Sequence, residues 1–357
     1  RVRSSAASDV YKRQQEAGED PKALECIPML KRSDIKREAA KIINEELTVD
    51  DSLFLYHDVC TNGIGYVDLM FKTDSIAPEQ IPYLGLLKSV LGYVDTENYT
   101  YGELFNEINA NTGGINCGVE VFDRADSTEE FQAMFSVRGK ALYTKMDFLF
   151  KMIGEILNSS KLEDTKRLYE IVASVKSRAQ VNLTGAGHST AVLRAAAYSS
   201  PMAAFQDEMA GIGYYQFIEK LEKDFEQRKE ETVEELCKLM KKILRPENFM
   251  ISYTGERESL ETVQKLAGTV KAGLGTEPVE KSKEKLTCTK KNEGFKTSGQ
   301  VQYVAQTGNF KKKGLEYTGA LEILKVILSY DYLWMNLRVK GGAYGLSLIH
   351  ISEPTRH

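Results

Sequence analysis

The first clear pattern of apolar and polar positions covers residues 53–71. An apolar run at 53–56 is followed by Asn62-Gly63 and then by a second run, 64–71, whose alternate residues are apolar. Asn-Gly between two β-type runs favours the positive φ angles of a tight turn. The pattern therefore predicts an antiparallel β-hairpin.

Helical spacing dominates the next segments. Apolar residues recur every three or four positions at Leu84, Leu87, Val90 and Leu91, which predicts a helix. Thr100 and Glu103 then have capping-box spacing, and the helix that they open is expected to bury Leu104, Phe105 and Ile108. Strand patterns return at 115–122 and 131–137.

The rest of the pattern adds helices and a closing strand. Helices are expected near 144–157, from the Ser160/Glu163 pair onward, and at about 229–244, with a strand at 249–254. The predicted order is β-β-α-α-β-β-α-α-α-β. Grouped helices between hairpins favour an α+β fold, with an antiparallel sheet and helices packed on one face.

A polar segment and a repeat follow. Residues 271–295 are rich in Lys, Gly and Glu and have no apolar period, which is typical of a linker. A strand pattern then returns at 301–304, and subtracting 237 from the positions Leu321, Leu324, Ile327 and Leu328 gives 84, 87, 90 and 91. The shared register predicts one complete domain plus the start of a homologous second copy, with a chance alignment as the alternative.

Composition narrows the class of protein. Of the 357 residues 42% are hydrophobic and 27% charged, and the net charge is −4, which is ordinary for a globular protein. We expect no nucleic-acid partner, because the chain has no basic excess, and no membrane, because no apolar run approaches ~18 residues. The cysteines are scattered, without a C-x-x-C pair, which favours reduced thiols in the cytoplasm over disulfides or a thiolate zinc site: Cys26, Cys60, Cys117, Cys237 and Cys288.

Both ends have unusual sequences. Residues 1–14 and 346–357 are similar to translated sequencing-adapter reads. We therefore expect both segments to be non-native and exclude them from fold reasoning.

Four blocks carry a resemblance to a known family. The chain resembles the presequence-protease branch of the insulinase/pitrilysin zinc peptidases, in which four homologous α+β domains form two halves that close on a peptide. The resemblance implies the C-terminal half: 15–37 ends a helical connector, 38–258 is the third domain, 259–298 a linker and 299–345 a truncated fourth domain. The blocks are HDVCTNGIGYVDLMF (57–71), TENYTYGELFNEINANTGGI (96–115), GHSTAVLRAAAYSSP (187–201) and LRVKGGAYG (337–345).

The last block implies the candidate site. By the resemblance, Arg338 and Tyr344 are catalytic and substrate-binding residues that reach across to a zinc site in the other half. Fixed donors that face a carbonyl oxygen lower the barrier to attack on a peptide bond, and Arg and Tyr both supply such donors. Gly341 and Gly342 would let the backbone turn sharply between them.

The metal ligands themselves are expected elsewhere. The family motif is His-x-x-Glu-His, and no two of the histidines here, His57, His188, His350 and His357, have its spacing. The resemblance thus implies a Zn²⁺-dependent metalloendopeptidase that degrades unstructured peptides in a closed chamber, with zinc bound by the N-terminal half of the same polypeptide. This chain alone is predicted to be inactive.

Two alternatives stay open. A non-catalytic family member could act as a structural or substrate-holding subunit. A serine hydrolase would need 187–191 to be a nucleophile elbow after a strand, but a helical pattern precedes it. We interpret His57 as a packing residue near a turn.

Overall fold

The computed structural model describes residues 25–29, 31–36, 38, 41–124, 127–282, 284, 286–297 and 299–348. The predicted adapter segment 1–14 and most of the other, 349–357, lie outside these residues. The chain forms two units, Arg1–Ile42 and Ile43–His357. In the described part of the first unit, a short 3-10 turn, η1 (Arg32–Asp34), is the regular structure.

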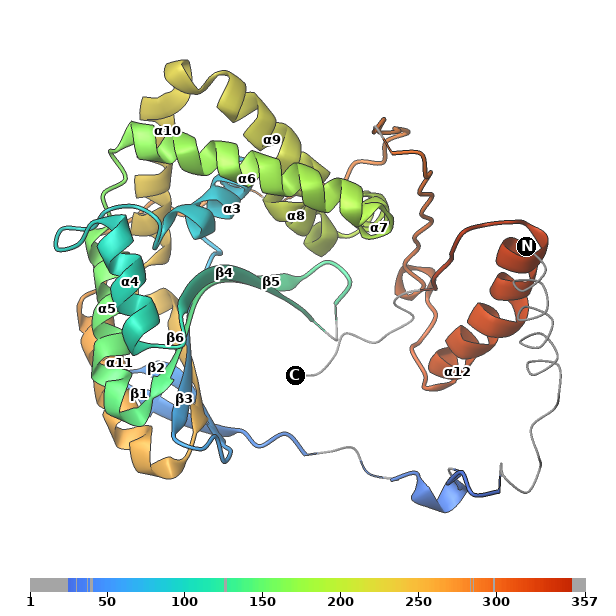
Figure 1. Ribbon diagram of the computed structural model, residues 1–357, viewed down its shortest axis with the longest axis horizontal. Coiled ribbons are helices and arrows are strands. Elements are labelled where there is room, and N and C mark those ends of the chain that lie inside the picture. The colour runs from blue at the N-terminus through green and yellow to red at the C-terminus, as the bar shows by residue number, and fades with distance from the viewer. Residues whose placement is uncertain are drawn as a thin grey trace, which may run out of the picture. The chain divides into compact units, whose positions relative to one another are not determined.

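The second unit is built on one six-stranded sheet (Figure 1). Its strand order is β1-β2-β6-β3-β5-β4. The β2–β6 pair is parallel and the other four pairs are antiparallel. The strands are β1 (Glu45–Val49), β2 (Ser52–Asp58), β3 (Ile64–Lys72), β4 (Ile115–Asp123), β5 (Phe131–Leu142) and β6 (Phe249–Gly255).

Groups of helices lie between β3 and β4, between β5 and β6 and after β6, and they confirm the α+β prediction. Alternate residues of β6 are buried, as expected of a sheet with helices over one face, and α4, α5 and α11 stand on one side of the strands in Figure 1. The helices are α3 (Ile81–Val90), α4 (Tyr101–Asn111), α5 (Met146–Ser159), α6 (Thr165–Gly185), α7 (Gly187–Ala197), α8 (Pro201–Ala210), α9 (Ile212–Lys223), α10 (Phe225–Ile243), α11 (Leu260–Ala272), α12 (Ala320–Ile327) and the π-helix η7 (Leu328–Lys340).

The core lies between the sheet and these helices. Tyr56 of β2 stacks on Tyr253 of β6 with ring centroids 6.0 Å apart, and both rings are fully buried. Gly85 lets α3 approach α8 closely, because a Cβ atom there would lie 2.6 Å from the Met209 carbonyl oxygen. The helix predicted from residues 84–91 is therefore a central core element, and Leu84, Leu87 and Val90 are all at most 1% exposed.

The predicted hairpin is wrong in its pairing. Asn62 and Gly63 have φ angles of 53° and 80°, so the turn forms as expected, but β6 lies between β2 and β3. The true hairpin joins β1 to β2, where Val49 pairs with Ser52 across Asp50 and Asp51. A turn signal fixes the local backbone, whereas a distant apolar strand can supply better partners for both flanking strands.

A carboxylate fastens the Asn62-Gly63 turn to the end of β6. Glu256 accepts backbone N–H bonds from Thr61 (3.0 Å), Asn62 (3.1 Å) and Gly63 (3.4 Å). The Tyr143 hydroxyl also donates to it. The hydrogen bond from Tyr143, followed by the backbone donors of the turn, lowers the pKa of Glu256 to about 2. The turn is therefore held by an anion in a cup of amide groups.

Helix starts are confirmed in one case and wrong in another. Thr100 and Glu103 form the predicted capping box at α4, with N–H bonds of 2.9 and 3.3 Å. Phe105, however, is 56% exposed rather than inward. At α6 the cap is Asp164, which accepts from the Arg167 N–H at 3.0 Å, and not the Ser160/Glu163 pair. Asp is as good a cap as Ser and lies closer to the apolar period.

The linker starts later than predicted. Residues 260–272 of the expected linker 259–298 form α11, which buries Leu260, Val263, Ala267 and Val270. These positions have helical spacing that the polar residues between them obscure. The described residues of 275–297 have no helix or strand, as expected of a linker.

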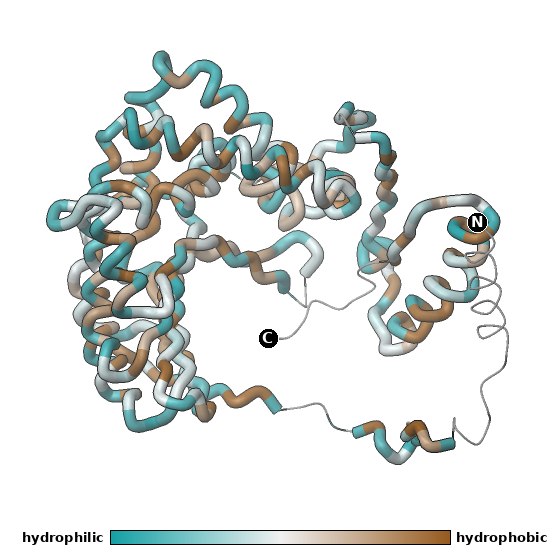
Figure 2. The backbone as a smooth tube through the Cα atoms, in the orientation of Figure 1, coloured by the Kyte–Doolittle hydropathy of each residue, from teal (hydrophilic) through white to brown (hydrophobic). Residues whose placement is uncertain are grey.

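The expected second copy is helical without a sheet. Residues 301–304 form no strand, so the predicted strand is wrong in this chain. The expected helix does form, as α12 and η7, and brown apolar stretches alternate along it with white and teal ones in Figure 2. Leu324 and Ile327 are 41% and 49% exposed, whereas Leu87 and Val90 at the matching positions are buried.

Replacing Glu256 with Gln should weaken the fold in a pH-dependent way. Because the folded-state pKa of Glu256 is lowered from 4.5 to about 2, its contribution is present above pH 4.5 and is lost as the pH falls toward 2. Urea denaturation should therefore show a lower midpoint for the variant at pH 7 and converging midpoints between pH 4.5 and 2. Glu258→Gln, at an exposed neighbour, should change little at any pH. If the urea midpoints of Glu256→Gln and wild type differed by the same amount at every pH, the Glu256 carboxylate would not be what holds the turn.

A matched pair of truncations tests which apolar helix is a core element in this chain. Leu87→Ala should cost about 2–5 kcal/mol of unfolding free energy, because Leu87 is 1% exposed and the change leaves a cavity. Leu324→Ala, at the matching exposed position, should stay within about 0.5 kcal/mol of wild type. Denaturant unfolding measures both, and equal costs would show that α12 is packed in this chain.

Candidate functional site

Arg338 lies near the end of the 13-residue helix η7. It is half-buried, and its guanidinium carbon lies 4.7 Å from the ring centroid of Trp334, one turn earlier. This cation–π contact orients the side chain along the helix. Among the described residues no carboxylate forms an ion pair with Arg338, so its charge is available to another group.

Two glycines, Gly341 and Gly342, follow the last residue of η7, Lys340. The Gly342 N–H donates to the Arg338 carbonyl at 3.0 Å, and the Ala343 N–H donates to the Leu337 carbonyl at 3.0 Å. Gly342 has a φ of 73°, and a Cβ atom at Gly341 would lie 2.7 Å from the Leu337 oxygen. Both positions therefore require glycine, as the expected sharp turn implied.

Tyr344 follows the turn and is 90% exposed. The turn thus presents a cationic donor on the helix and a phenolic donor just beyond it, both accessible from outside. The predicted roles of Arg338 and Tyr344 stay a prediction, since they require groups that this chain does not supply.

The histidines do not gather into a metal site. Nδ1 of His57 lies 2.7 Å from the Ile43 carbonyl oxygen, and its Nε2 lies 3.2 Å from the Ser252 hydroxyl. His57 therefore links β2 to Ile43 and to β6. His188 lies 6.3 Å from the Tyr303 ring. Across the described residues, no group of three or more His, Cys, Asp or Glu side chains could hold a metal ion. These residues do not fit a zinc site; His350 and His357 lie outside the described part.

The segment 187–191 is not a nucleophile elbow. Ser189 lies inside α7, and α6 ends at Gly185, so only Ala186 separates the two helices. An elbow needs a strand before the nucleophile. The serine-hydrolase alternative is therefore excluded.

The sequence did not reveal a buried ionic cluster centred on Arg194 of α7. Its Nη1 lies 2.5 Å from Asp207 Oδ2 and its Nε lies 2.6 Å from Glu293 Oε1, while the Tyr198 hydroxyl donates to the same Glu293 oxygen at 2.6 Å. The side chains of Arg194 and Asp207 are only 12% and 2% exposed. Asp207 also accepts from the first N–H groups of α9, at Ile212. The sequence did contain a signal for this ion pair, since Arg194 and Asp207 are charged residues within largely apolar helices. It gave no signal for Glu293, which lies far away along the chain.

The cluster perturbs its own titratable groups. The hydrogen bond from Arg194 lowers the pKa of Glu293. Burial raises the pKa of Tyr198, and the neighbouring Glu293 carboxylate raises it further. Arg194 and Glu293 therefore stay charged, and Tyr198 stays protonated, over the whole neutral range.

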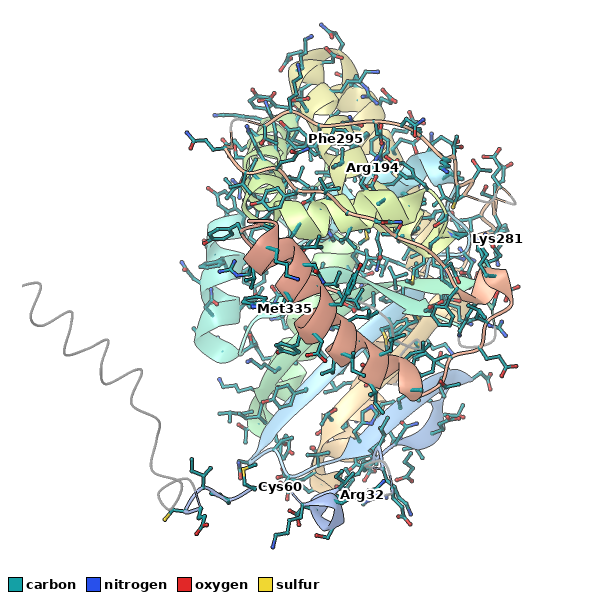
Figure 3. All side chains as sticks on the ribbon, turned by 90° about the vertical axis from the view of Figure 1, so that its right-hand side faces the viewer. Arg32, Cys60, Arg194, Lys281, Phe295 and Met335 are labelled. Atoms are coloured by element: carbon teal, nitrogen blue, oxygen red, sulfur yellow. The ribbon has the colours of Figure 1, made fainter. Side chains whose placement is uncertain are left out.

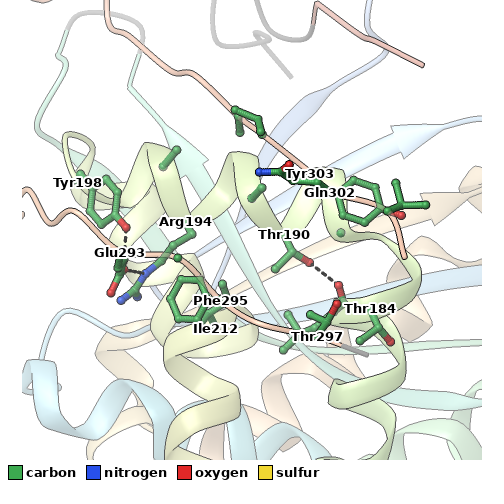
Figure 4. A pocket seen from close by; sticks show the side chains of 18 residues that line it. Thr184, Thr190, Arg194, Tyr198, Ile212, Glu293, Phe295, Thr297, Gln302 and Tyr303 are labelled. Carbon is green, nitrogen blue, oxygen red and sulfur yellow. Dashed lines mark hydrogen bonds and ion pairs between the residues drawn. The ribbon is translucent and has the colours of Figure 1, made fainter. Parts of the chain in front are cut away.

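A cavity of 450 Å³ adjoins this cluster (Figures 3 and 4). Its floor is formed by α6 and α7, including Thr184, Thr190 and Arg194, and its outer wall by the irregular segment 293–305. Figure 4 shows Glu293, Arg194 and Tyr198 joined at one end, and Tyr303 at the other.

A second cavity, of 320 Å³, lies on the sheet near β3 and β5. Arg138 pairs there with Asp68 at 2.7 Å and with Glu120 at 3.1 Å. The other Asp68 oxygen, Oδ1, is buried and has no hydrogen-bond partner among the described residues. Burial raises the pKa of Asp68. Because Arg138 and two carboxylates already neutralise one another in part, this face is less suited than the Arg194 cluster to an anionic group.

None of the described helices is both long and apolar enough to cross a membrane.

Comparison with curated proteins finds relatives that are about three times as long as this chain. It is 38% identical over 335 residues to protein HypA of Clostridium perfringens, a match that covers 94% of this chain and 34% of that protein. It is 28% identical over 343 residues to presequence protease 1, chloroplastic/mitochondrial, of Arabidopsis thaliana, covering 95% and 31%. It is 28% identical over 347 residues to the mitochondrial presequence protease of Saccharomyces cerevisiae, a match that covers 93% of this chain and 34% of that protein. The chain thus spans about one third of the length of these relatives.

Solved structures give more distant matches. A peptidase M16 inactive domain from Pseudomonas fluorescens aligns with a TM-score of 0.44 at 14% identity, covering 67% of this chain and 53% of that one. A conserved protein from Enterococcus faecalis aligns with a TM-score of 0.46 at 12% identity, covering 64% and 52%.

A family model described as associated with the peptidases of family M16, subgroup C, matches residues 7–221. The match spans more than half of the 357 residues, and the relatives named presequence protease agree with it. The expected resemblance is confirmed: this chain belongs to the family associated with subgroup C of the M16 peptidases.

Proposed function

We propose that this chain is the C-terminal-half part of a longer zinc-dependent metalloendopeptidase, an oligopeptidase that degrades unstructured peptides in a closed chamber. The observation that carries the proposal is the match over more than nine tenths of this chain to presequence proteases of which it spans one third. The exposed turn that carries Arg338 and Tyr344 supports the same function. The cytoplasmic location expected from the sequence stays a prediction.

Arg338 and Tyr344 would bind substrate and stabilise the transition state. When a peptide carbonyl is attacked, negative charge builds on its oxygen, and a guanidinium and a phenolic O–H placed there are worth more in the transition state than in the ground state. The Trp334 contact and the Gly341-Gly342 turn would limit the freedom of both donors. Fewer rotamers then need to be frozen as substrate binds.

Zinc would bind in the part of the longer polypeptide that precedes this chain. The described residues here do not fit a metal site, so this chain is proposed to be inactive alone. Its proposed partners are the other half of the same polypeptide and the peptide substrate.

The domain division is also part of the proposal. Residues 43–274 would be the complete third domain, extended through α11, and 299–345 the start of a homologous fourth domain. The exposure of Leu324 and Ile327 supports this division, because their counterparts Leu87 and Val90 are buried in a complete core.

Substitutions in the full-length enzyme test the proposed donors. Arg338→Ala and Tyr344→Phe should each lower kcat by about 10²–10³-fold, the usual effect of removing one oxyanion donor, with little change in melting temperature. Tyr330→Phe, at a side chain that is 69% exposed on the same helix, is the matched control and should keep wild-type kcat. Cleavage of a fluorogenic peptide measures all three. A double variant of Arg338 and Tyr344 with wild-type turnover would end the assignment.

The same measurement separates the enzyme from the non-catalytic alternative. A full-length protein that binds unstructured peptides but does not cleave them in the presence of zinc would support a substrate-holding subunit instead. A full-length sequence without His-x-x-Glu-His would lead to the same conclusion.

Truncation of Leu324 in the longer polypeptide tests the division into domains. If α12 begins a second complete domain, Leu324→Ala should there cost about 2–5 kcal/mol, as for a buried leucine, rather than the small cost expected in this chain. Denaturant unfolding of the full-length protein gives the value. A near-zero cost in the longer protein would contradict the predicted repeat.

A further inference from the structure

Arg194 is held in place without help from the segment 293–305. Asp207, buried in α8, binds Nη1 of Arg194 and also accepts from the N–H groups of Ile212 and Gly213 at 3.0 and 3.2 Å. Asp207 is therefore fixed by the start of α9, and Arg194 is fixed by Asp207. The remaining donor edge of the guanidinium, at Nε, faces outward toward Glu293.

The described residues of segment 293–305, which are 293–297 and 299–305, lie across the helices without regular secondary structure. Glu293 accepts from Arg194 and from Tyr198, both at 2.6 Å, and the Phe295 ring lies 5.7 Å from the Arg194 guanidinium carbon. Further along, the Tyr303 ring covers Gly187 so closely that a Cβ atom at Gly187 would lie 2.4 Å from it. A carboxylate and an aromatic ring two residues later are thus the groups that this segment places against Arg194.

The segment is held by side chains and leaves space beneath it. Within the described residues, no backbone–backbone hydrogen bond joins 286–305 to a helix. The cavity of 450 Å³ between the segment and the helices is large enough for a peptide of several residues to occupy part of it. An occupant with the same two side chains could replace the segment without breaking a helix or a strand.

We propose that this groove is a binding site for an extended peptide that carries a carboxylate two residues before an aromatic ring, and that Glu293-Gly294-Phe295 occupies it in cis. The carboxylate would bind Nε of Arg194 and the Tyr198 hydroxyl, and the aromatic ring would pack beside the guanidinium. The site is distinct from Arg338 and Tyr344, and the inference does not rest on the proposed function.

The charges around the groove favour a carboxylate over a phosphate group. Arg194 and Asp207 together are neutral, so one further negative charge replaces that of Glu293 without a net change. Glu208, whose pKa is raised by burial and by Asp207, lies in the same cluster. Lys291 also lies near Glu208 and Glu293, but it precedes Glu293 in the segment that a peptide would displace. A dianionic phosphate would then face both Asp207 and Glu208 with one guanidinium between them, which is unfavourable.

The test uses the full chain with a weakened cis segment. The variant Glu293→Gln/Phe295→Ala should bind a fluorescein-labelled peptide KKNEGFKT, which copies residues 290–297, at least tenfold more tightly than wild type. In wild type the tethered segment competes at an effective concentration of about millimolar. Fluorescence anisotropy gives the dissociation constants, and circular dichroism checks that each variant is folded.

Matched changes locate the binding. In the weakened background, Arg194→Lys should reduce the affinity at least tenfold, because Lys lacks the forked donors that serve Asp207 and the ligand together, and Tyr198→Phe should reduce it severalfold. A peptide with Gln in place of its Glu should bind as weakly as the Arg194→Lys protein binds the original. Arg138→Lys, on the sheet, should have no effect.

Three results would overturn the proposal. They are no binding to the folded Glu293→Gln/Phe295→Ala variant, equal binding of the Glu and Gln peptides, and unchanged affinity in both Arg194→Lys and Tyr198→Phe. A phosphoserine peptide that bound more tightly than the Glu peptide would also contradict the inferred ligand chemistry.

Discussion

The insertion of β6 between β2 and β3 is the constraint on which the rest of the fold depends. β6 is parallel to β2 and antiparallel to β3, and the helices α3 to α10 lie between β3 and β6 along the chain. Its Tyr253 stacks on Tyr56 in the core, and Glu256 just beyond it binds the turn that leads into β3. Without β6, neither flanking strand would have a partner on that edge, and α11 would have no strand to follow. Such non-local pairing is the slow and costly step in forming a sheet.

The same constraint explains which sequence predictions succeeded. The capping box of Thr100 and Glu103, the Asn62-Gly63 turn and the apolar period of α3 depend on neighbouring residues, and all of them are confirmed. The partner of β2 on its inner side is a strand far along the chain, where Phe54 pairs with Ile251, and no local pattern encodes it. Phe105 fails for a related reason: helical spacing defines an apolar stripe, but the width of the stripe that is buried depends on what packs against it. The type of most elements was therefore predictable, except that 260–272 forms a helix and 301–304 forms no strand. Strand order was not predictable.

The two arginine sites differ in how much the sequence could show. Arg338 was proposed from a family motif, and the structure adds the Trp334 contact and a turn in which Gly341 and Gly342 are both required. Arg194 lies in a motif block as well, yet its role could not be inferred, since Glu293 is 99 residues away. A buried ion pair is visible from sequence only as a charged residue on an apolar helix, and such a residue has many possible partners.

Charge balance separates what these two arginines can do. Arg194 lies between two carboxylates, and its side chain is only 12% exposed. Asp207 alone balances its charge, so one carboxylate can replace another at the Nε edge while the guanidinium stays paired. Arg338 rests on an aromatic ring, which offsets part of its desolvation but supplies no negative charge. No carboxylate among the described residues neutralises Arg338 in the resting protein. Its positive charge can therefore interact with an oxygen that becomes negative in a transition state. A guanidinium paired with carboxylates is suited to holding a ligand, whereas a half-buried one without a carboxylate among the described residues is suited to responding to a reaction.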